Sequence, residues 1–212
     1  MSALRILLLI TSVVTVTSHH NITAILSEFP KYTEFNNYLT QTKLDNEINS
    51  HQTITVLVLS NGVVSSLASK HPLSIVKDVL SLHILLNYYD NQTLHNISNG
   101  TTLSPTLYNT TGNAPGIAGF VNITTDMKGG NVSFCSAVSG SKLDSYYTKS
   151  VKQIPYNISV LEIDSPIIAP SILTAHAHST DDVISISGSS VGVTITPFPH
   201  RLERQQRPLY VA

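Results

Sequence analysis

The sequence carries little charge. Charged residues make up 12% of its 212 residues, which is well below the usual share, and the formal net charge is −1. Without a basic surface the chain has no electrostatic footprint for nucleic acid, so we expect no nucleic-acid partner. Something other than charge must then keep the surface soluble. Serine, threonine and asparagine are abundant, and glycans attached to them would serve this purpose.

Cysteine occurs once, as Cys135, so an intrachain disulfide is excluded. Its neighbours Phe134 and Val138 are apolar, and we expect a buried filler rather than a reactive thiol. The sequence also lacks a phosphate-binding loop, a dinucleotide fingerprint and a paired cysteine motif, and its carboxylates show no paired acid–base arrangement. We therefore expect no cofactor, no metal and no enzymatic activity.

One apolar run stands out, and it lies at the start of the chain. Residues 1–5 supply a short positive region, residues 6–14 an apolar core, and residues 16–18 small side chains suited to cleavage. This pattern predicts a secretory signal peptide over residues 1–18, with an apolar core too short to span a bilayer. We expect no transmembrane segment after it. Because charges interrupt residues 199–212, we also expect no signal for a glycosylphosphatidylinositol anchor.

Eight Asn-x-Ser/Thr sequons follow the predicted signal peptide, and none has proline in the middle position. This is more than chance would place in the chain, and it predicts a secreted, N-glycosylated protein whose sequon asparagines are exposed. The eight asparagines are Asn21, Asn91, Asn96, Asn99, Asn109, Asn122, Asn131 and Asn157.

Two apolar, β-branched runs at residues 53–61 and 156–164 predict buried strands that pair in the middle of one domain. After the first run, Ser60 or Asn61 is placed to cap a helix over residues 63–70 by accepting a backbone hydrogen bond. Apolar periodicity predicts further helices over residues 19–50 and 73–86, the second of which carries His83 on its inner face.

The second half of the chain favours strands. We expect short strands joined by glycosylated turns over residues 90–112, and a hairpin of residues 117–125 and 132–138 around the turn 128–131. Residues 143–151 fit a short helix or a strand. Helices followed by strands indicate an α+β fold. We place the end of the domain at residues 166–170, with a possible hairpin over residues 182–196 and a disordered end beyond it.

Three polar patterns allow more than one interpretation. Gly188-Ser189-Ser190-Val191-Gly192 fits the G-x-S-x-G pattern of a serine hydrolase with Ser190 as the nucleophile, although a hairpin turn explains its glycines better. His176 and His178 would share one face of a strand and could hold a metal, but a third ligand is missing nearby. His83, among apolar residues, is expected to be a core histidine with satisfied hydrogen bonds.

The two strand runs, together with residues 82–90 between them, resemble the three motifs of the fasciclin domain. Segments 36–42, 128–132 and 155–161 are similar to plant fasciclin-like arabinogalactan proteins, and the resemblance covers about residues 20 to 170. The positions that match the family motifs are Thr53, Val56, Asn61, His83, Tyr156, Val160 and Ile163.

The resemblance implies a fasciclin-type domain over residues 19–170, in which a helical N-terminal half packs on a β-sandwich or wedge, followed by a divergent tail at residues 171–212. It implies a secreted protein of the cell wall or extracellular matrix that acts in adhesion. Anchored members of the family lie on the outer face of the plasma membrane. The implied partners are cell-surface or cell-wall glycoproteins and polysaccharides, or a second copy of the chain.

Overall fold

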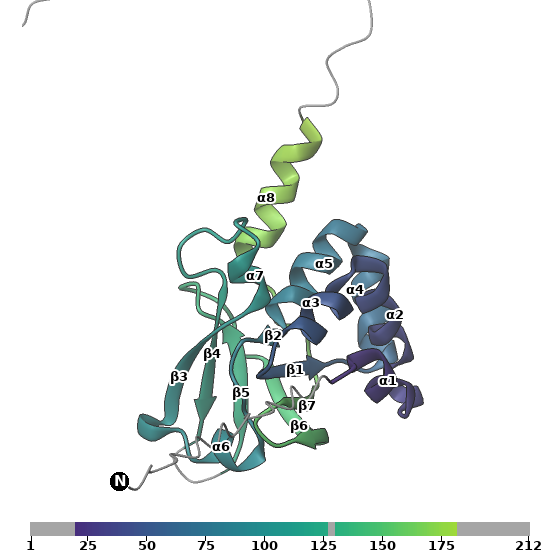
Figure 1. Ribbon diagram of the computed structural model, residues 1–212. Helices are drawn as coiled ribbons and strands as arrows, with labels where there is room; N and C mark the ends of the chain where they lie inside the picture. The colour runs from purple at the N-terminus through teal and green to yellow at the C-terminus, as the bar shows by residue number, and fades with distance from the viewer. Residues whose placement is uncertain (1–19, 127–129, 182–212) are drawn as a thin grey trace, which may run out of the picture.

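A mixed sheet of seven strands is at the centre of the computed structural model, which describes residues 20–126 and 130–181 (Figure 1). The strands are arranged in the order β2-β1-β7-β6-β5-β4-β3. Their bounds are β1 Ile54–Val58, β2 Ile84–Leu85, β3 Thr101–Pro105, β4 Phe120–Thr125, β5 Val132–Ser136, β6 Ser145–Ile154 and β7 Ile158–Ile163. Helices precede most of the strands along the chain, so the predicted α+β class is confirmed.

The two apolar runs pair with each other as adjacent strands, as predicted, and stand second and third in the sheet. Strands β1 and β7 pair in parallel with Val56 opposite Val160, and every residue of both strands is buried. Burial on both faces explains why the two runs are continuously apolar rather than alternating. Burial of this much branched aliphatic surface is the main contribution of the sheet to the stability of the domain.

The sheet curls into a wedge because its two ends meet. β5 and β6 share a short ladder in which Ser133 pairs with Tyr146 and Phe134 with Ser145, which lets the sheet bend at this point. At the far ends, the Leu86 N–H donates to the Pro105 carbonyl at 2.9 Å, which connects the segment after β2 to β3. The predicted β4–β5 hairpin is antiparallel, although residues 127–129 of its turn lie outside the described part. Cys135 lies in β5 and is buried, as expected.

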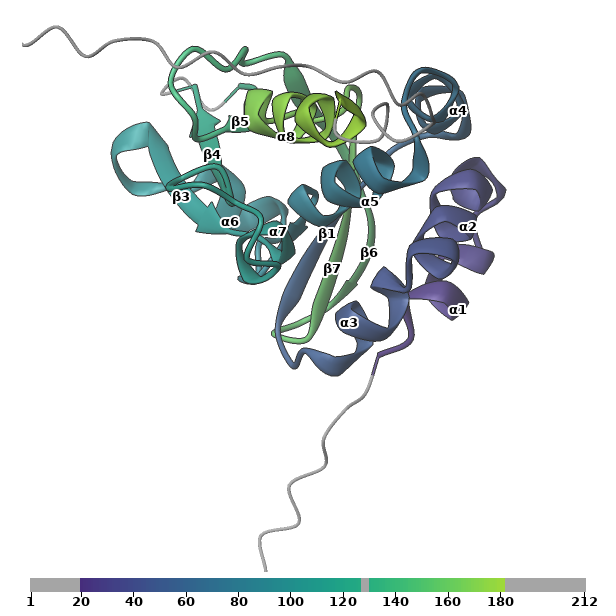
Figure 2. The ribbon, with the colours of Figure 1, turned by 90° about the horizontal axis from the view of Figure 1, so that it is seen from above.

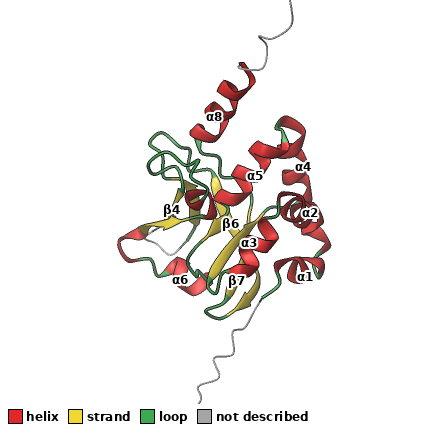
Figure 3. Ribbon diagram, turned by 45° about the horizontal axis from the view of Figure 1, so that its top comes forward, coloured by secondary structure: helices red, strands yellow, loops and turns green. Residues whose placement is uncertain are grey.

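Helices cover one side of the β1–β7 pair (Figures 2 and 3). Large side chains that are fully buried, such as Phe35, Leu39 and Ile48, face the core from these helices. The bounds are α1 Ile22–Ser27, the 3₁₀ helix η1 Pro30–Tyr32, α2 Thr33–Thr42, α3 Leu44–Ser50, α4 Asn61–Lys70 and α5 Leu73–Leu82. The helical prediction for residues 19–50 is therefore confirmed as several short helices.

Two predicted segments differ from the structure. The helix expected to reach residue 86 ends at Leu82, because His83 caps it and Ile84–Leu85 turn into strand β2. Residues 90–112 contain one strand, β3, rather than several. The other elements there are α6 Asn91–His95, the 3₁₀ helix η2 Ser98–Gly100 and α7 Leu107–Thr110. Asp90 starts α6 with a capping box, in which its carboxylate accepts from the Thr93 N–H, and this local bonding favours helix over strand.

A final helix, α8 Pro170–Asp181, projects from the domain (Figure 1). Its first turn packs inward through Ile172, which is fully buried, so the predicted boundary at residues 166–170 lies directly before a helix. Residues 176 and 178 lie in this helix rather than in a strand, so the strand geometry assumed for a metal pair was wrong. The possible hairpin over residues 182–196, with Ser190, lies outside the described residues.

Candidate functional site

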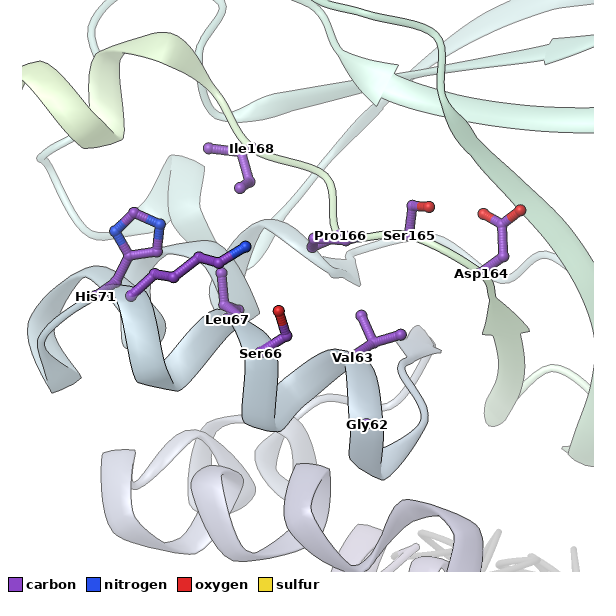
Figure 4. Close-up of a pocket in the computed structure, with 10 residues that line it drawn as sticks. Gly62, Val63, Ser66, Leu67, His71, Asp164, Ser165, Pro166 and Ile168 are labelled. Atoms are coloured by element: carbon purple, nitrogen blue, oxygen red, sulfur yellow. The ribbon is translucent and has the colours of Figure 1, made fainter.

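A surface groove runs between helix α4 and the segment that follows β7 (Figure 4). Its volume is about 450 Å³. Val63, Ser66 and Leu67 project into it from α4, and Pro166 and Ile168 form the opposite wall. The groove is mostly apolar, with Lys70, His71 and Asp164 at its margins. It can therefore receive an apolar surface and a small number of polar groups.

His83 fixes the wall of this groove from inside the protein. Its imidazole is fully buried, Nδ1 lies 2.7 Å from the Val79 carbonyl, and the Ile167 N–H donates to Nε2 at 3.1 Å. Because the Ile167 N–H is a donor, Nε2 must be unprotonated and Nδ1 must carry the hydrogen. Burial lowers the pKa of His83 to about 4, against the opposing effect of the Val79 bond. The central-motif histidine is thus a satisfied core residue, as expected, and ties α5 to the segment 164–168.

One polar group at the margin of the groove, Asp164, makes a structural bond. Asp164 Oδ1 accepts from the Tyr146 N–H at 2.8 Å, which anchors the start of the groove wall to β6.

A serine and a histidine lie close together away from the groove. Ser50 Oγ and His51 Nδ1 are 3.4 Å apart, but the same nitrogen lies 2.8 Å from the Glu47 carbonyl and donates a hydrogen bond to it. A nitrogen that carries a bonded hydrogen cannot accept a proton from serine.

A buried carboxylate links the helices to β7. Glu162 is 4% exposed, accepts from the Tyr32 hydroxyl at 2.9 Å and forms ion pairs with Lys31 and Lys149. Burial pushes the pKa of Glu162 up, but the bonds from Lys31 and Tyr32 and the charge of Lys149 together hold it below its usual value. Burial and the bond to Glu162 raise the pKa of Tyr32. Sequence reasoning missed this network, although one glutamate inside an apolar strand run was a signal for a buried ion pair.

The motif residues divide into core, connector and surface positions. Val56, Val160 and Ile163 belong to the buried β1–β7 pair. Thr53, just before β1, uses its hydroxyl to donate to the Tyr156 carbonyl at 3.1 Å. The Tyr156 side chain itself is 83% exposed. The structure therefore brings the first and second motifs together and leaves one aromatic ring in solvent.

Asn61 makes a different helix cap from the one predicted. Ser60 is the N-cap of α4 but makes no side-chain cap bond there. The Asn61 side chain instead accepts from the Glu34 N–H at 3.0 Å and donates to the Pro30 carbonyl at 2.9 Å. This bond satisfies a free backbone N–H in the first turn of α2. The prediction that a side chain here caps a helix was therefore correct, but the helix that Asn61 caps is α2 and not the one over residues 63–70.

The sequon asparagines lie mainly away from the helical side. Asn122 is half-buried in β4 and Asn99 lies in η2, where its side chain is not described. At Asn21 the side-chain oxygen accepts from the Ala24 N–H, which leaves the nitrogen, the atom that carries a glycan, outside this bond. The exposed members are Asn21, Asn91, Asn96, Asn109 and Asn131.

Asn157 does not fit the expectation that every sequon asparagine is exposed. It is 9% exposed, and its side-chain oxygen lies 2.5 Å from His20 Nδ1. His20 is itself buried and also contacts the Ile48 carbonyl through Nε2 at 3.0 Å. The asparagine connects the first described residue of the chain to the start of β7. A glycan at this position would require the side chain to leave its buried site.

Comparison with known proteins agrees with this architecture. The fasciclin domain family matches residues 30–138. Fasciclin-like arabinogalactan protein 8 of Arabidopsis thaliana is 71% identical over 162 residues, which cover 76% of this chain and 38% of the relative. Fasciclin-like arabinogalactan protein 10 of the same plant is 66% identical over 177 residues, which cover 84% of this chain and 42% of the relative. The chain thus spans less than half the length of these relatives.

A solved structure shares the fold at low sequence identity. It is a FAS1 domain pair from the insect cell adhesion molecule fasciclin I, 17% identical, with a TM-score of 0.50 over 66% of this chain and 46% of that one. Among the helices in residues 20–126 and 130–181, we find none with the length and apolarity to cross a membrane. The matched family and the wedge-shaped sheet agree that the chain belongs to the fasciclin-domain family, and within it the chain is similar to plant fasciclin-like arabinogalactan proteins.

Proposed function

We propose that this protein is a secreted, N-glycosylated adhesion module that helps to organise the plant cell wall or extracellular matrix. It acts by binding cell-surface or cell-wall glycoproteins and polysaccharides, or a second copy of itself, and it performs no chemical reaction. The fasciclin family, and the shared fold of fasciclin I, an insect cell adhesion molecule, support this role.

The observation that carries the proposal is the distribution of sequons over the surface. Helices α2 to α5, which span residues 33–82, contain no sequon, whereas α6, the β4–β5 hairpin and α7 carry most of the exposed ones. Glycans on the second group would supply the solubility that 12% charged residues do not. They would also leave the helical side, with its groove, open to a partner. An asymmetric coat of this kind suits a module that binds on one side.

The test is to produce the full chain with an epitope tag in plant cells and to follow where it goes. We expect the protein in the medium and cell-wall fractions, with a mass that falls after treatment with a peptide N-glycosidase. Beads coated with it should bind isolated cell walls or clump with one another.

A matched pair of variants sharpens the test. Replacing the five exposed sequon asparagines by glutamine should remove most of the mass shift and promote aggregation, whereas Asn157→Gln should remove little of it. Retention of the chain inside the cell, or beads that bind neither walls nor each other, would refute the proposal.

A further inference from the structure

Tyr156 occupies a position that is unfavourable for tyrosine in two independent ways. The Asn157 N–H donates to the Ile154 carbonyl at 3.0 Å, so residues 154–157 form a β-turn between β6 and β7. Tyr156 has a φ of 59°, in the left-handed region that bulky residues avoid. Because Pro155 cannot have positive φ, the turn belongs to type II, in which glycine or asparagine normally follows proline. The ring is also 83% exposed to solvent.

A second tyrosine lies beside it. The rings of Tyr88 and Tyr156 have centroids 5.8 Å apart and an interplanar angle of 36°, although the residues are far apart in the sequence. Tyr88 follows β2 and is half-buried, so it supports one side of the exposed ring. The pair thus places the exposed Tyr156 at the surface, with the half-buried Tyr88 beside it.

Two threonines at the start of β1 hold both tyrosines in place. The hydroxyl of the buried Thr55 donates to the Asn87 carbonyl at 2.7 Å and accepts from the Tyr89 N–H at 2.8 Å, which fixes the backbone on both sides of Tyr88. The Thr53 hydroxyl donates to the Tyr156 carbonyl at 3.1 Å. The backbone around both tyrosines is therefore fixed to the buried strand β1, and little ordering of backbone is needed when a ligand binds.

The adjoining sequon leaves the pair uncovered. Asn157 directly follows Tyr156, but its side chain points inward to His20 and does not place a glycan over the ring. Burial raises the pKa of Tyr88, and the negative charge of the nearby Asp90 adds to this effect. A polyanion is disfavoured at such a site.

We propose that Tyr156 and Tyr88 form a stacking platform for the sugar rings of a neutral polysaccharide of the cell wall. The inference rests on the proposed function and assigns to it a polysaccharide-binding surface that is separate from the groove beside α4. The face of a tyrosine ring is electron-rich and attracts the weakly positive C–H groups on the apolar side of a pyranose ring. Two rings are too small for a stable protein interface, which buries about 800 Å² per partner. They match the size of one or two sugar units.

The experiment measures binding of the secreted full chain to soluble polysaccharides by affinity gel electrophoresis. The neutral probes are hydroxyethyl cellulose, β-1,4-galactan and arabinoxylan, and polygalacturonate is the charged counterpart. We expect retardation by at least one neutral probe and none by polygalacturonate. Tyr156→Gly should weaken binding by about two- to tenfold, because the loss of one aromatic contact changes an affinity by a factor of that size. Its melting temperature should equal or exceed that of the wild type, since glycine relieves the backbone strain.

Three further variants complete the test. Tyr156→Asn, which also tolerates positive φ, should repeat the result of Tyr156→Gly, and Tyr156→Trp should keep binding. Tyr146→Ala removes another exposed tyrosine, 44% exposed on β6, and should leave binding unchanged. Asn91→Gln removes the first sequon after Tyr88. The wild type should bind without this substitution. Binding that appears only in this variant would mean that the chain's own glycan occupies the rings, and it would overturn the proposal.

Failure of this inference can be distinguished from failure of the proposed function. If beads carrying wild type and Tyr156→Gly bind cell walls equally well, the platform is wrong and adhesion uses another surface. Equal binding of both proteins to the neutral probes, preference for polygalacturonate, or no binding to any probe would likewise overturn the platform. Wild-type beads that ignore cell walls and one another would refute the adhesion role itself.

Discussion

Acidification should weaken this fold through His83. In the folded protein the imidazole is fully buried, and its Nε2 is occupied as an acceptor by the Ile167 N–H. A proton on Nε2 would break this bond and leave an unpaired buried charge. The pKa of His83 is therefore about 4 in the folded state, compared with about 6.5 for an unperturbed histidine.

The sign and size of the effect follow from linkage. Below pH 6.5 the unfolded chain binds a proton that the folded chain refuses, so the contribution to stability is complete above pH 6.5 and declines as pH falls towards 4. The full difference in pKa corresponds to about 3 kcal/mol, of which about 2 kcal/mol is already lost at pH 5. A domain of this size has a free energy of unfolding of about 5–15 kcal/mol, so the loss is measurable.

Urea unfolding at pH values between 7.5 and 5 would measure this loss of stability. Circular dichroism and tyrosine fluorescence can follow the transition, since the chain has no tryptophan. His83→Gln should be less stable at pH 7.5 and should lose the pH dependence above pH 5, where few carboxylates titrate. His51→Gln, at a half-buried histidine on the surface, is the matched control and should keep the wild-type slope. A slope that persists in His83→Gln would refute the assignment of the acid sensitivity to His83.

Three further predictions concern stability and can be measured by thermal or urea unfolding. Leu57→Ala in the fully buried β1 should cost about 2–5 kcal/mol, and an unchanged melt would contradict its place in the core. Gly119→Ala should cost about 1–3 kcal/mol of stability because the new Cβ would lie 2.5 Å from the Asn109 Cα. Gly62→Ala is the control and should stabilise α4, because no atom lies within 4 Å of its new Cβ. Equal effects of the two substitutions would refute the clash. Glu162→Gln should cost about 1–3 kcal/mol at pH 7. The Glu162 carboxylate stabilises the fold at pH values above its unfolded pKa, and this stabilisation is lost in acid. The free energies of unfolding of the wild type and Glu162→Gln should therefore converge near pH 3. A difference that stays constant with pH would argue against the ion pairs.

Much of the fold could be predicted from the sequence because its strongest signals are local. The runs in β1 and β7 are apolar and β-branched, which favours buried strands, and the short helices before them show clear apolar periodicity. The end of α5 was misplaced because the apolar pattern continues through Ile84 and Leu85. Periodicity alone cannot separate a buried helix from a buried two-residue strand.

The features that define the candidate sites depend on contacts between distant residues. The inward position of Asn157 requires His20 from the other end of the domain, and no property of the sequon shows this. The left-handed conformation of Tyr156 also escaped the sequence analysis. Pro155 was a usable signal, because proline at the second position of a turn often precedes a residue with positive φ. The groove beside α4 arises only when the segment after β7 is placed against that helix.

The parallel pairing of β1 with β7 also determines when this domain can fold during synthesis. Residue 54 pairs with residue 158, so the central ladder cannot form until nearly the whole domain has left the ribosome. Closing a loop of this length is slow, and topologies dominated by such distant contacts fold late. In the secreted, glycosylated protein that we propose, every sequon before β7 reaches the glycosylation machinery before the β1–β7 ladder forms, whereas Asn157 arrives with the strand whose pairing buries it. The order of translation thus places a competition between sugar transfer and folding at this one asparagine.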